Sequence, residues 1–256
     1  MQFAYRRIIP CLDTKDGRLV KGVNFVNLKD VGDPAEIGEA YSRAGADEIV
    51  LLDITATIEG RKTLMEVVKR TVQRLTVPLT VGGGIGGIAD MEAILTAGAS
   101  AVSINTAAVK NPVLVEVAAK RFGSDKIVVA IDTAKNPNLP SGFEVTVRGG
   151  TQKTGKDAVA WAKEVERLGA GQILPTSMDT DGTQAGYDIP MTRAIAAAVK
   201  IPVIASGGAG SLEHLYQAVA EAKADAVLVA SVFHFGKHTI REAKEYLRSK
   251  GIAVRL

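Results

Sequence analysis

The sequence has little of what would place a protein outside the cell or in a membrane. Its single cysteine, Cys11, excludes an internal disulfide, which is typical of a reducing compartment. No apolar run approaches the roughly 18 residues that a membrane-spanning helix needs, and the first ten residues lack the apolar core of a signal peptide. We therefore expect a cytoplasmic protein that makes no membrane contact.

An excess of one charge is also missing. The chain carries 31 basic and 28 acidic residues, a net charge of +3, and its basic residues form no block. This distribution predicts no clustered basic surface of the kind that binds nucleic acid, so no nucleic-acid partner is expected. With 256 residues, 46% of them apolar, the chain is too apolar for a disordered protein and long enough for one large core.

Short β-branched runs alternate with longer segments of helical periodicity along the whole sequence. The expected strands are Arg7–Cys11, Glu48–Leu52, Leu79–Val81, Ala101–Ile104, Lys126–Ile131, Gln172–Leu174, Val203–Ala205 and Ala226–Val229. The expected helices lie near 33–44, 61–74, 88–97, 111–121, 156–168, 189–198, 211–221 and 239–249. Eight strands that alternate with eight helices predict a (β/α)8 TIM barrel of the α/β class.

The second half of the sequence repeats the first. Residues 77–109 align with residues 201–233, and IIPCLDTKDG at 8–17 aligns with VVAIDTAKNP at 128–137. We interpret 1–256 as a single barrel domain with an internal two-fold repeat, whose half-barrels cover about 1–125 and 126–256. A ligand site at the barrel mouth should then occur twice.

Two aspartates follow equivalent strands in this repeat, Asp13 after the first and Asp132 after the fifth. Active sites of such barrels lie at the carboxyl ends of the strands. Two carboxylates on opposite sides of the mouth suit one acid and one base acting on two faces of a substrate. The alternative is that each caps its own loop by accepting backbone hydrogen bonds. The symmetric placement favours catalysis.

Glycine-rich turns and small residues also occur in two matched copies. Backbone N–H groups that crowd together at such turns bind phosphate without a cation. A tight strand-to-helix turn also needs glycine for geometry alone, but two matched copies favour two anion sites and a long ligand with a phosphate at each end. The residues concerned are Gly83, Gly84, Asn105 and Thr106 in the first copy, and Gly207, Gly208, Ala230 and Ser231 in the second.

Other polar residues carry weaker signals. Lys21 lies in an expected glycine-bearing loop, either as the cation of a lid over an anionic substrate or as a solvated side chain. Cys11 is interpreted as core filling, since no Cys/His pair suggests itself. His234 and His238 have no carboxylate cluster or HExxH context, and Asp181 in DTDG lacks the closing glutamate of a calcium loop. No metal and no cofactor are expected.

Nine motifs in one order give the chain a family resemblance. It resembles the cyclase subunit of imidazole glycerol phosphate synthase over essentially its whole length. That family uses ammonia to convert an open-chain bisphosphate aminoimidazole carboxamide nucleotide to imidazole glycerol phosphate and aminoimidazole carboxamide ribotide, in histidine biosynthesis. The motifs are CLD (11–13), KGVNF (21–25), DITAT (53–57), VGGGI (81–85), SINTAA (103–108), AID (130–132), TSMDTDGTQAGYD (176–188), ASGGAG (205–210) and ASVFHFG (230–236).

The resemblance implies residue roles. Asp13 and Asp132 become the general acid and base, and Lys21 lies on a mobile loop. Thr176 and Ser206 would lie near the reacting centre. One phosphate would be held by Gly84, Asn105 and Thr106, and the other by Asp181, acting through its backbone, with Gly182, Gly208, Ala230 and Ser231.

The resemblance also implies a partner, a glutaminase subunit that docks at the N-terminal face of the barrel and supplies ammonia. The family often closes that face with a ring of alternating charges. Arg7 and Glu48 match the ring, but Ala101 and Gln172 are neutral and Ser100 replaces a common interface acid. The sequence thus predicts a more open floor or an altered glutaminase contact. Pro175, where leucine is usual, predicts a local bulge near Thr176.

Two alternatives stay open at this stage. The sister sugar-phosphate isomerase of the same pathway is another duplicated half-barrel with two aspartates and two phosphate sites, and it needs no ammonia. A non-catalytic or engineered barrel scaffold would explain the altered floor, because fold alone does not fix function. The intact pair Asp13 and Asp132, with both glycine turns, argues against a scaffold.

Overall fold

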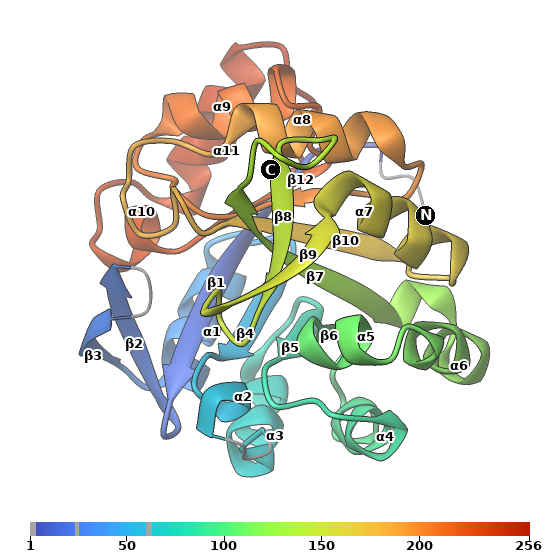
Figure 1. Cartoon of the computed structure of the whole chain (residues 1–256). Coiled ribbons are helices and arrows are strands. Elements are labelled where there is room, and N and C mark those ends of the chain that lie inside the picture. The colour runs from blue at the N-terminus through green and yellow to red at the C-terminus, as the bar shows by residue number, and fades with distance from the viewer. Residues whose placement is uncertain (1–3, 24–25, 60–62) are drawn as a thin grey trace.

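The computed structural model describes residues 4–23, 26–59 and 63–256, and the side chains of 21–29 and of 57–58 lie outside the described part. Its central feature is a barrel of eight parallel strands surrounded by helices (Figure 1). The barrel strands are β1 (Arg7–Lys15), β4 (Ile49–Asp53), β5 (Leu79–Gly82), β6 (Ala101–Ile104), β7 (Ile127–Lys135), β10 (Gln172–Ser177), β11 (Ile204–Ala205) and β12 (Ala226–Val229).

These strands pair in the chain order β1, β4, β5, β6, β7, β10, β11 and β12, and β12 pairs back with β1. The junction of β10 with β11 is the weakest, because it consists of two isolated parallel bridges, Ile173 with Val203 and Thr176 with Ser206. In this ring β1 and β7 are fourth neighbours in either direction. The strands that carry Asp13 and Asp132 therefore lie on opposite sides of the barrel.

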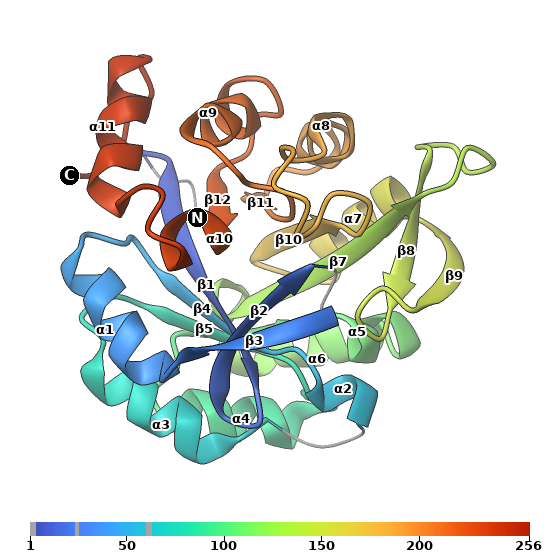
Figure 2. The ribbon, with the colours of Figure 1, turned by 90° about the vertical axis from the view of Figure 1, so that its left-hand side faces the viewer.

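Helices cover the outside of the barrel, with α1 and α3 on one side and α8, α9 and α11 on the other (Figure 2). Asp33 caps α1 by accepting from the backbone N–H groups of Ala35 and Glu36, and Pro34 is the first residue of the helix, where its missing N–H costs no hydrogen bond. The helices are α1 (Pro34–Arg43), α2 (Ala56–Glu59), α3 (Met65–Arg74), α4 (Ile88–Thr96), α5 (Thr106–Lys110), α6 (Val113–Phe122), α7 (Ala158–Arg167), α8 (Ile189–Ala198), α9 (Leu212–Ala220), α10 (Ser231–His234) and α11 (Ile240–Ser249), with a 3-10 turn at Ser124–Lys126.

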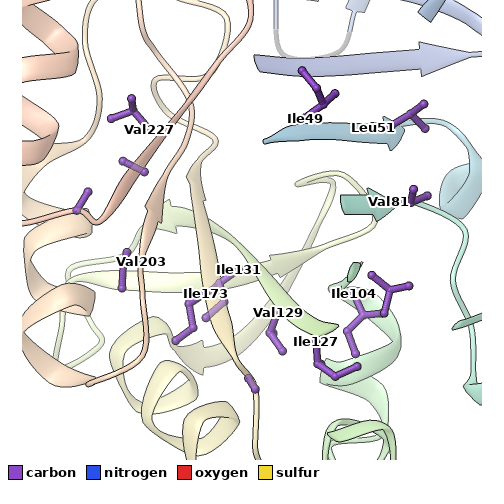
Figure 3. Close-up of a cluster of buried hydrophobic side chains, with 14 of the residues drawn as sticks. Ile49, Leu51, Val81, Ile104, Ile127, Val129, Ile131, Ile173, Val203 and Val227 are labelled. Carbon is purple, nitrogen blue, oxygen red and sulfur yellow. The ribbon is translucent and has the colours of Figure 1, made fainter. Parts of the chain in front are cut away.

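The core has two layers because side chains alternate between the two faces of each strand. Outward-facing residues such as Ile49, Val129 and Ile173 pack between the strands and the helices (Figure 3). Inward-facing residues fill the barrel itself and include Ile9, Cys11, Val50, Ala101, Val128, Leu174, Ile204, Ala226 and Leu228. Cys11 thus belongs to the barrel core, as the sequence predicts.

The predicted eight strands and the barrel are confirmed, but the sequence missed two hairpins. After β1 the chain forms β2 (Arg18–Val23) and β3 (Val26–Gly32), and after β7 it forms β8 (Phe143–Val147) and β9 (Gln152–Asp157). Each hairpin is antiparallel to the strand that it follows, which repeats the two-fold pattern. Lys21 is therefore not in a loop, since it lies in β2 opposite Lys29. Its side chain is outside the described part of the chain.

Pro175 causes no bulge, contrary to the prediction. Strand β10 pairs with β7 in one register from Gln172 to Ser177, and Pro175 lies opposite Ile131. The carbonyl of Pro175 accepts a hydrogen bond from the backbone N–H of Ser206. The proline lacks a donor, but its acceptor still contributes to the closure of the barrel.

Candidate active site

A cavity of about 720 Å³ lies at the carboxyl ends of the barrel strands. The β8–β9 hairpin crosses the centre of the view into the barrel (Figure 1), and Gly149 at its tip lines the cavity. The side chain of Lys21 lies outside the described part of the chain. All the other site residues predicted from the sequence line this cavity. They are Asp13, Gly83, Gly84, Asn105, Thr106, Asp132, Thr176, Asp181, Gly182, Ser206, Gly207, Gly208, Ala230 and Ser231.

Asp13 and Asp132 face this one cavity from opposite strands. Their surroundings differ. The thiol of Cys11 donates a hydrogen bond to Oδ1 of Asp13, with sulfur and oxygen 3.2 Å apart, while the side-chain amide of Asn105 donates to Oδ2 of Asp132 over 2.9 Å. Equivalent positions in the repeat thus carry carboxylates with chemically different neighbours.

The titration of Asp132 is strongly shifted. Burial, together with the nearby carboxylate of Asp181, raises the pKa of Asp132 to about 7, and the hydrogen bond from Asn105 opposes that rise. A carboxyl group with this pKa is partly protonated at neutral pH. Asp132 can therefore either donate or accept a proton under physiological conditions.

Asn105 has a role that the sequence did not reveal. Its amide nitrogen is engaged with Asp132, so the side-chain nitrogen is directed at the carboxylate rather than at an anion site. Its Oδ1 atom is buried and has no hydrogen-bond partner among the described residues. Asn105 thus presents an unused acceptor next to Asp132 in a cavity, where a ligand donor would satisfy it.

The two glycine turns have matching backbones. Gly83 and Gly84 have φ angles of 92° and 70°, and Gly207 and Gly208 have φ angles of 86° and 104°. An added Cβ would lie 2.1 Å from the carbonyl oxygen of Asp53 at Gly83, and 2.1 Å from that of Gly186 at Gly208. Only glycine fits these positions, so the turns are tight for steric reasons whether or not they also bind an anion.

The short helices α5 and α10 begin with the same backbone geometry at equivalent positions. The residue before α5, Asn105, has φ −126° and ψ −83°, and the residue before α10, Ala230, has φ −120° and ψ −76°. In the first copy the Oγ1 of Thr106 accepts a hydrogen bond from the backbone N–H of Arg148, at the hairpin tip. The repeat seen in the sequence therefore extends to the local conformation of the cavity wall.

Asp181 is held in its own turn by a backbone hydrogen bond. Its backbone N–H already donates to the carbonyl of Ser177 over 2.9 Å. Its carboxylate is the neighbour that raises the pKa of Asp132. The nearby Asp179 accepts from the backbone N–H of Lys135 and so holds the turn to β7. Across the described part of the chain, no group of three or more His, Cys, Asp or Glu side chains is arranged to hold a metal ion.

The chain is similar to known proteins of histidine biosynthesis. A family model described as histidine biosynthesis protein matches residues 7–239. The chain is 58% identical over 253 residues to imidazole glycerol phosphate synthase subunit HisF of Trichormus variabilis, covering 98% of both chains. It is 57% identical over 253 residues to the subunit of the same name from a Nostoc species, covering 98% of this chain and 97% of the relative. The chain belongs to the HisF family of histidine biosynthesis proteins.

The match to the family spans all eight barrel strands and every residue named above for the cavity. At the opposite end of this HisF-family barrel, Arg7 is only 3% exposed and fills the floor. Its guanidinium donates to Glu48 over 2.8 Å and to Gln172 over 2.6 Å, and Thr80 donates to the second oxygen of Glu48. Burial lowers the pKa of Arg7 and raises that of Glu48. The neutral Gln172 thus still takes part in a hydrogen-bonded floor.

None of the described helices combines the length and the apolar composition needed to cross a membrane.

Proposed function

We propose that the chain is the cyclase subunit of imidazole glycerol phosphate synthase. It would convert an open-chain bisphosphate aminoimidazole carboxamide nucleotide and ammonia to imidazole glycerol phosphate and aminoimidazole carboxamide ribotide. The observation that carries this proposal is one cavity in which two opposed aspartates, Asp13 and Asp132, lie between two matched glycine turns. The HisF relatives support the same reaction.

In the proposed reaction the two carboxyl groups move protons while ammonia adds, the imidazole ring closes and a C–N bond breaks. Asp132, with a pKa of about 7, is suited to donate a proton to a leaving nitrogen at neutral pH. Asp13, which accepts a hydrogen bond from Cys11, is assigned the role of base. The unused Oδ1 of Asn105 would accept a hydrogen bond from an N–H group of the ligand.

The phosphates would bind at the two ends of the cavity. A ligand with one phosphate at each end matches the two turns, and its centre would lie over the aspartates. We assign one phosphate to Gly83, Gly84, Asn105 and Thr106. We assign the other to Gly182, Gly207, Gly208, Ala230 and Ser231, with Asp181 at the edge of this second phosphate site. Thr176 and Ser206 are assigned to the neighbourhood of the reacting centre. The role of Lys21 as a cation that faces the anionic substrate remains a prediction.

We further propose that a glutaminase subunit docks at the N-terminal face and supplies the ammonia, in the cytoplasm. The floor of Arg7, Glu48 and Gln172 lies between that face and the cavity. Ala101, a small core residue, replaces a charged member of the ring found in the family. The boundary between the two half-barrels is proposed near residue 125, at the 3-10 turn Ser124–Lys126.

A single assay tests the reaction and separates it from the alternatives. The purified chain is incubated with the bisphosphate nucleotide, with and without ammonium salts, and both imidazole glycerol phosphate and the carboxamide ribotide are quantified. Turnover that requires ammonium supports the cyclase. The sister isomerase would instead open the ribose of the ring-closed form of the nucleotide without ammonium, so that form is assayed in parallel. A lack of turnover of either form would identify a non-catalytic scaffold. Repeating the assay with glutamine and a glutaminase subunit tests the proposed partner.

A further inference from the structure

His234, the last residue of α10, links two distant parts of the fold. Its Nε2 lies 2.9 Å from the backbone carbonyl oxygen of Cys11 on β1, and its Nδ1 lies 2.6 Å from the hydroxyl of Tyr41 on α1. The rings of Tyr41 and His234 also stack, with their centroids 5.6 Å apart. These contacts join the beginning of the chain to residue 234 on the side where α10 lies beside β1 (Figure 2).

The carbonyl partner fixes the direction of one hydrogen bond, and the neutral form of the ring then fixes the direction of the other. A carbonyl oxygen only accepts, so Nε2 of His234 must carry the proton that faces Cys11. In the neutral imidazole the other nitrogen, Nδ1, is then an acceptor, and the hydroxyl of Tyr41 must be the donor. Burial raises the pKa of Tyr41, which keeps that hydroxyl protonated. The order of donation is therefore Tyr41 to His234 to Cys11.

The link ends at groups that face the cavity. The carbonyl held by His234 belongs to Cys11, whose thiol donates to Asp13. The other side of the link is α10, and both Ala230, which precedes this helix, and Ser231, its first residue, line the cavity. Helix α10 is four residues long, so its own hydrogen bonds do little to hold it in place.

We propose that His234 is a positioning residue that holds the Asp13 end of β1 at a fixed place relative to the Ala230–Ser231 wall of the cavity. Tyr41 completes the link by holding the imidazole in its Nε2–H tautomer. This inference rests on the proposed function, because it assigns His234 to the geometry of that reaction. A side chain that merely fills space would affect stability but not the separation of these two cavity walls.

The first test is steady-state kinetics of the whole chain with saturating ammonium. His234→Ala should lower kcat/KM at least about tenfold, since one positioning hydrogen bond is lost. His234→Gln, which keeps an N–H donor, should recover most of the loss. Tyr41→Phe keeps the stacked ring and should lower kcat/KM less than His234→Ala, and the double variant should be no worse than His234→Ala alone. His238→Ala, a matched histidine variant beyond α10, should behave as wild type.

The second test does not depend on turnover. In protein labelled with ¹⁵N-histidine, His234 should show a protonated Nε2 and an unprotonated Nδ1, and Tyr41→Phe should perturb the Nδ1 signal. A protonated Nδ1 with a bare Nε2 overturns the proposal, as do folded His234→Ala and Tyr41→Phe variants whose kcat/KM stays within twofold of wild type. If the wild type does not turn over the bisphosphate at all, the proposed function fails, and the tautomer alone then decides whether the link exists.

Discussion

Asn105 donates a hydrogen bond to Oδ2 of Asp132 over 2.9 Å, and this contact makes the two halves of the site unequal. At the equivalent place in the first half, Asp13 accepts instead from the thiol of Cys11. The backbones of the repeat match closely, but these side chains do not. A duplicated barrel can thereby place two aspartates in different environments, one of them partly protonated at neutral pH. Acid–base catalysis uses such a difference, because one group must donate a proton while the other accepts one.

Two substitutions should move the titration of Asp132 in opposite directions. Asn105→Ala removes a hydrogen bond that lowers the pKa of Asp132, so that pKa should rise. Asp181→Asn removes a negative charge that raises it, so the pKa should fall. If protonated Asp132 is the acid, the alkaline limb of kcat against pH should shift to higher pH in the first variant and to lower pH in the second. Shifts of the same sign would mean that another group controls this limb.

Asp13→Asn and Asp132→Asn should each lower ammonia-dependent turnover by about 10²–10⁴-fold or more, because each removes a proton-transfer group without changing the shape of the side chain. Circular dichroism and the thermal midpoint at pH 4 should stay close to those of the wild type. A variant that turned over normally would show its aspartate to be structural. Sulfate or phosphate bound at both glycine turns in crystals would test the anion sites independently.

Asp132 should also make the fold less stable as the pH rises. Its folded pKa of about 7 lies above the value in the unfolded chain, so the folded state binds more protons between these values and loses stability through that window. Asn cannot ionise. Asp132→Asn should therefore match the wild type near pH 4 and exceed it by about 4 kcal/mol at pH 8, at about 1.4 kcal/mol for each of about three units of pKa difference. Urea unfolding at the two pH values measures this gain, and equal stability at pH 8 would contradict it.

The strands and the repeat could be predicted because they depend on local patterns. Runs such as Ala101–Ile104 and Ala226–Val229 have the same bounds in sequence and structure, since buried β-branched runs between turn residues leave little choice. The hairpins were missed for two different reasons. The strand Gln152–Asp157 is polar, largely exposed or half-exposed, and carries no hydrophobic alternation. The strand Phe143–Val147 does alternate, as FEVTV, and is mostly buried, and this signal was overlooked. Lys21 was assigned to a loop because of the neighbouring glycines at 17 and 22.

The cavity residues could be predicted because the ends of barrel strands meet at one face. What could not be predicted is which side chains contact each other there. Asn105 and Asp132 are 27 residues apart, and His234 and Cys11 are 223 apart, so no spacing rule connects them. The backbone of Asp181 was expected to hold a ligand, but the turn uses its N–H for Ser177, a detail set by the three-dimensional path of the loop.

The barrel floor gives the last prediction. Arg7 and Glu48 form an ion pair in which both side chains are less than 10% exposed, whereas the pair Arg121 and Glu92 on the surface is about half-exposed. Arg7→Met leaves the Glu48 carboxylate buried without its counter-charge, so it should cost about 3–5 kcal/mol. Arg121→Met, the matched surface control, should cost less than about 1 kcal/mol.

The pH dependence identifies the cause of the loss. Burial already raises the pKa of Glu48, and without Arg7 it should rise further, so the folded variant takes up a proton that the unfolded chain releases. The loss from Arg7→Met should therefore grow as the pH rises above the folded pKa of Glu48 in the wild type, which itself lies above the ordinary value for Glu. Arg7→Met combined with Glu48→Gln should recover most of it. Urea unfolding between pH 5 and pH 8 measures both effects, and a loss that is independent of pH and persists in the double variant would mean that Arg7 acts by packing alone.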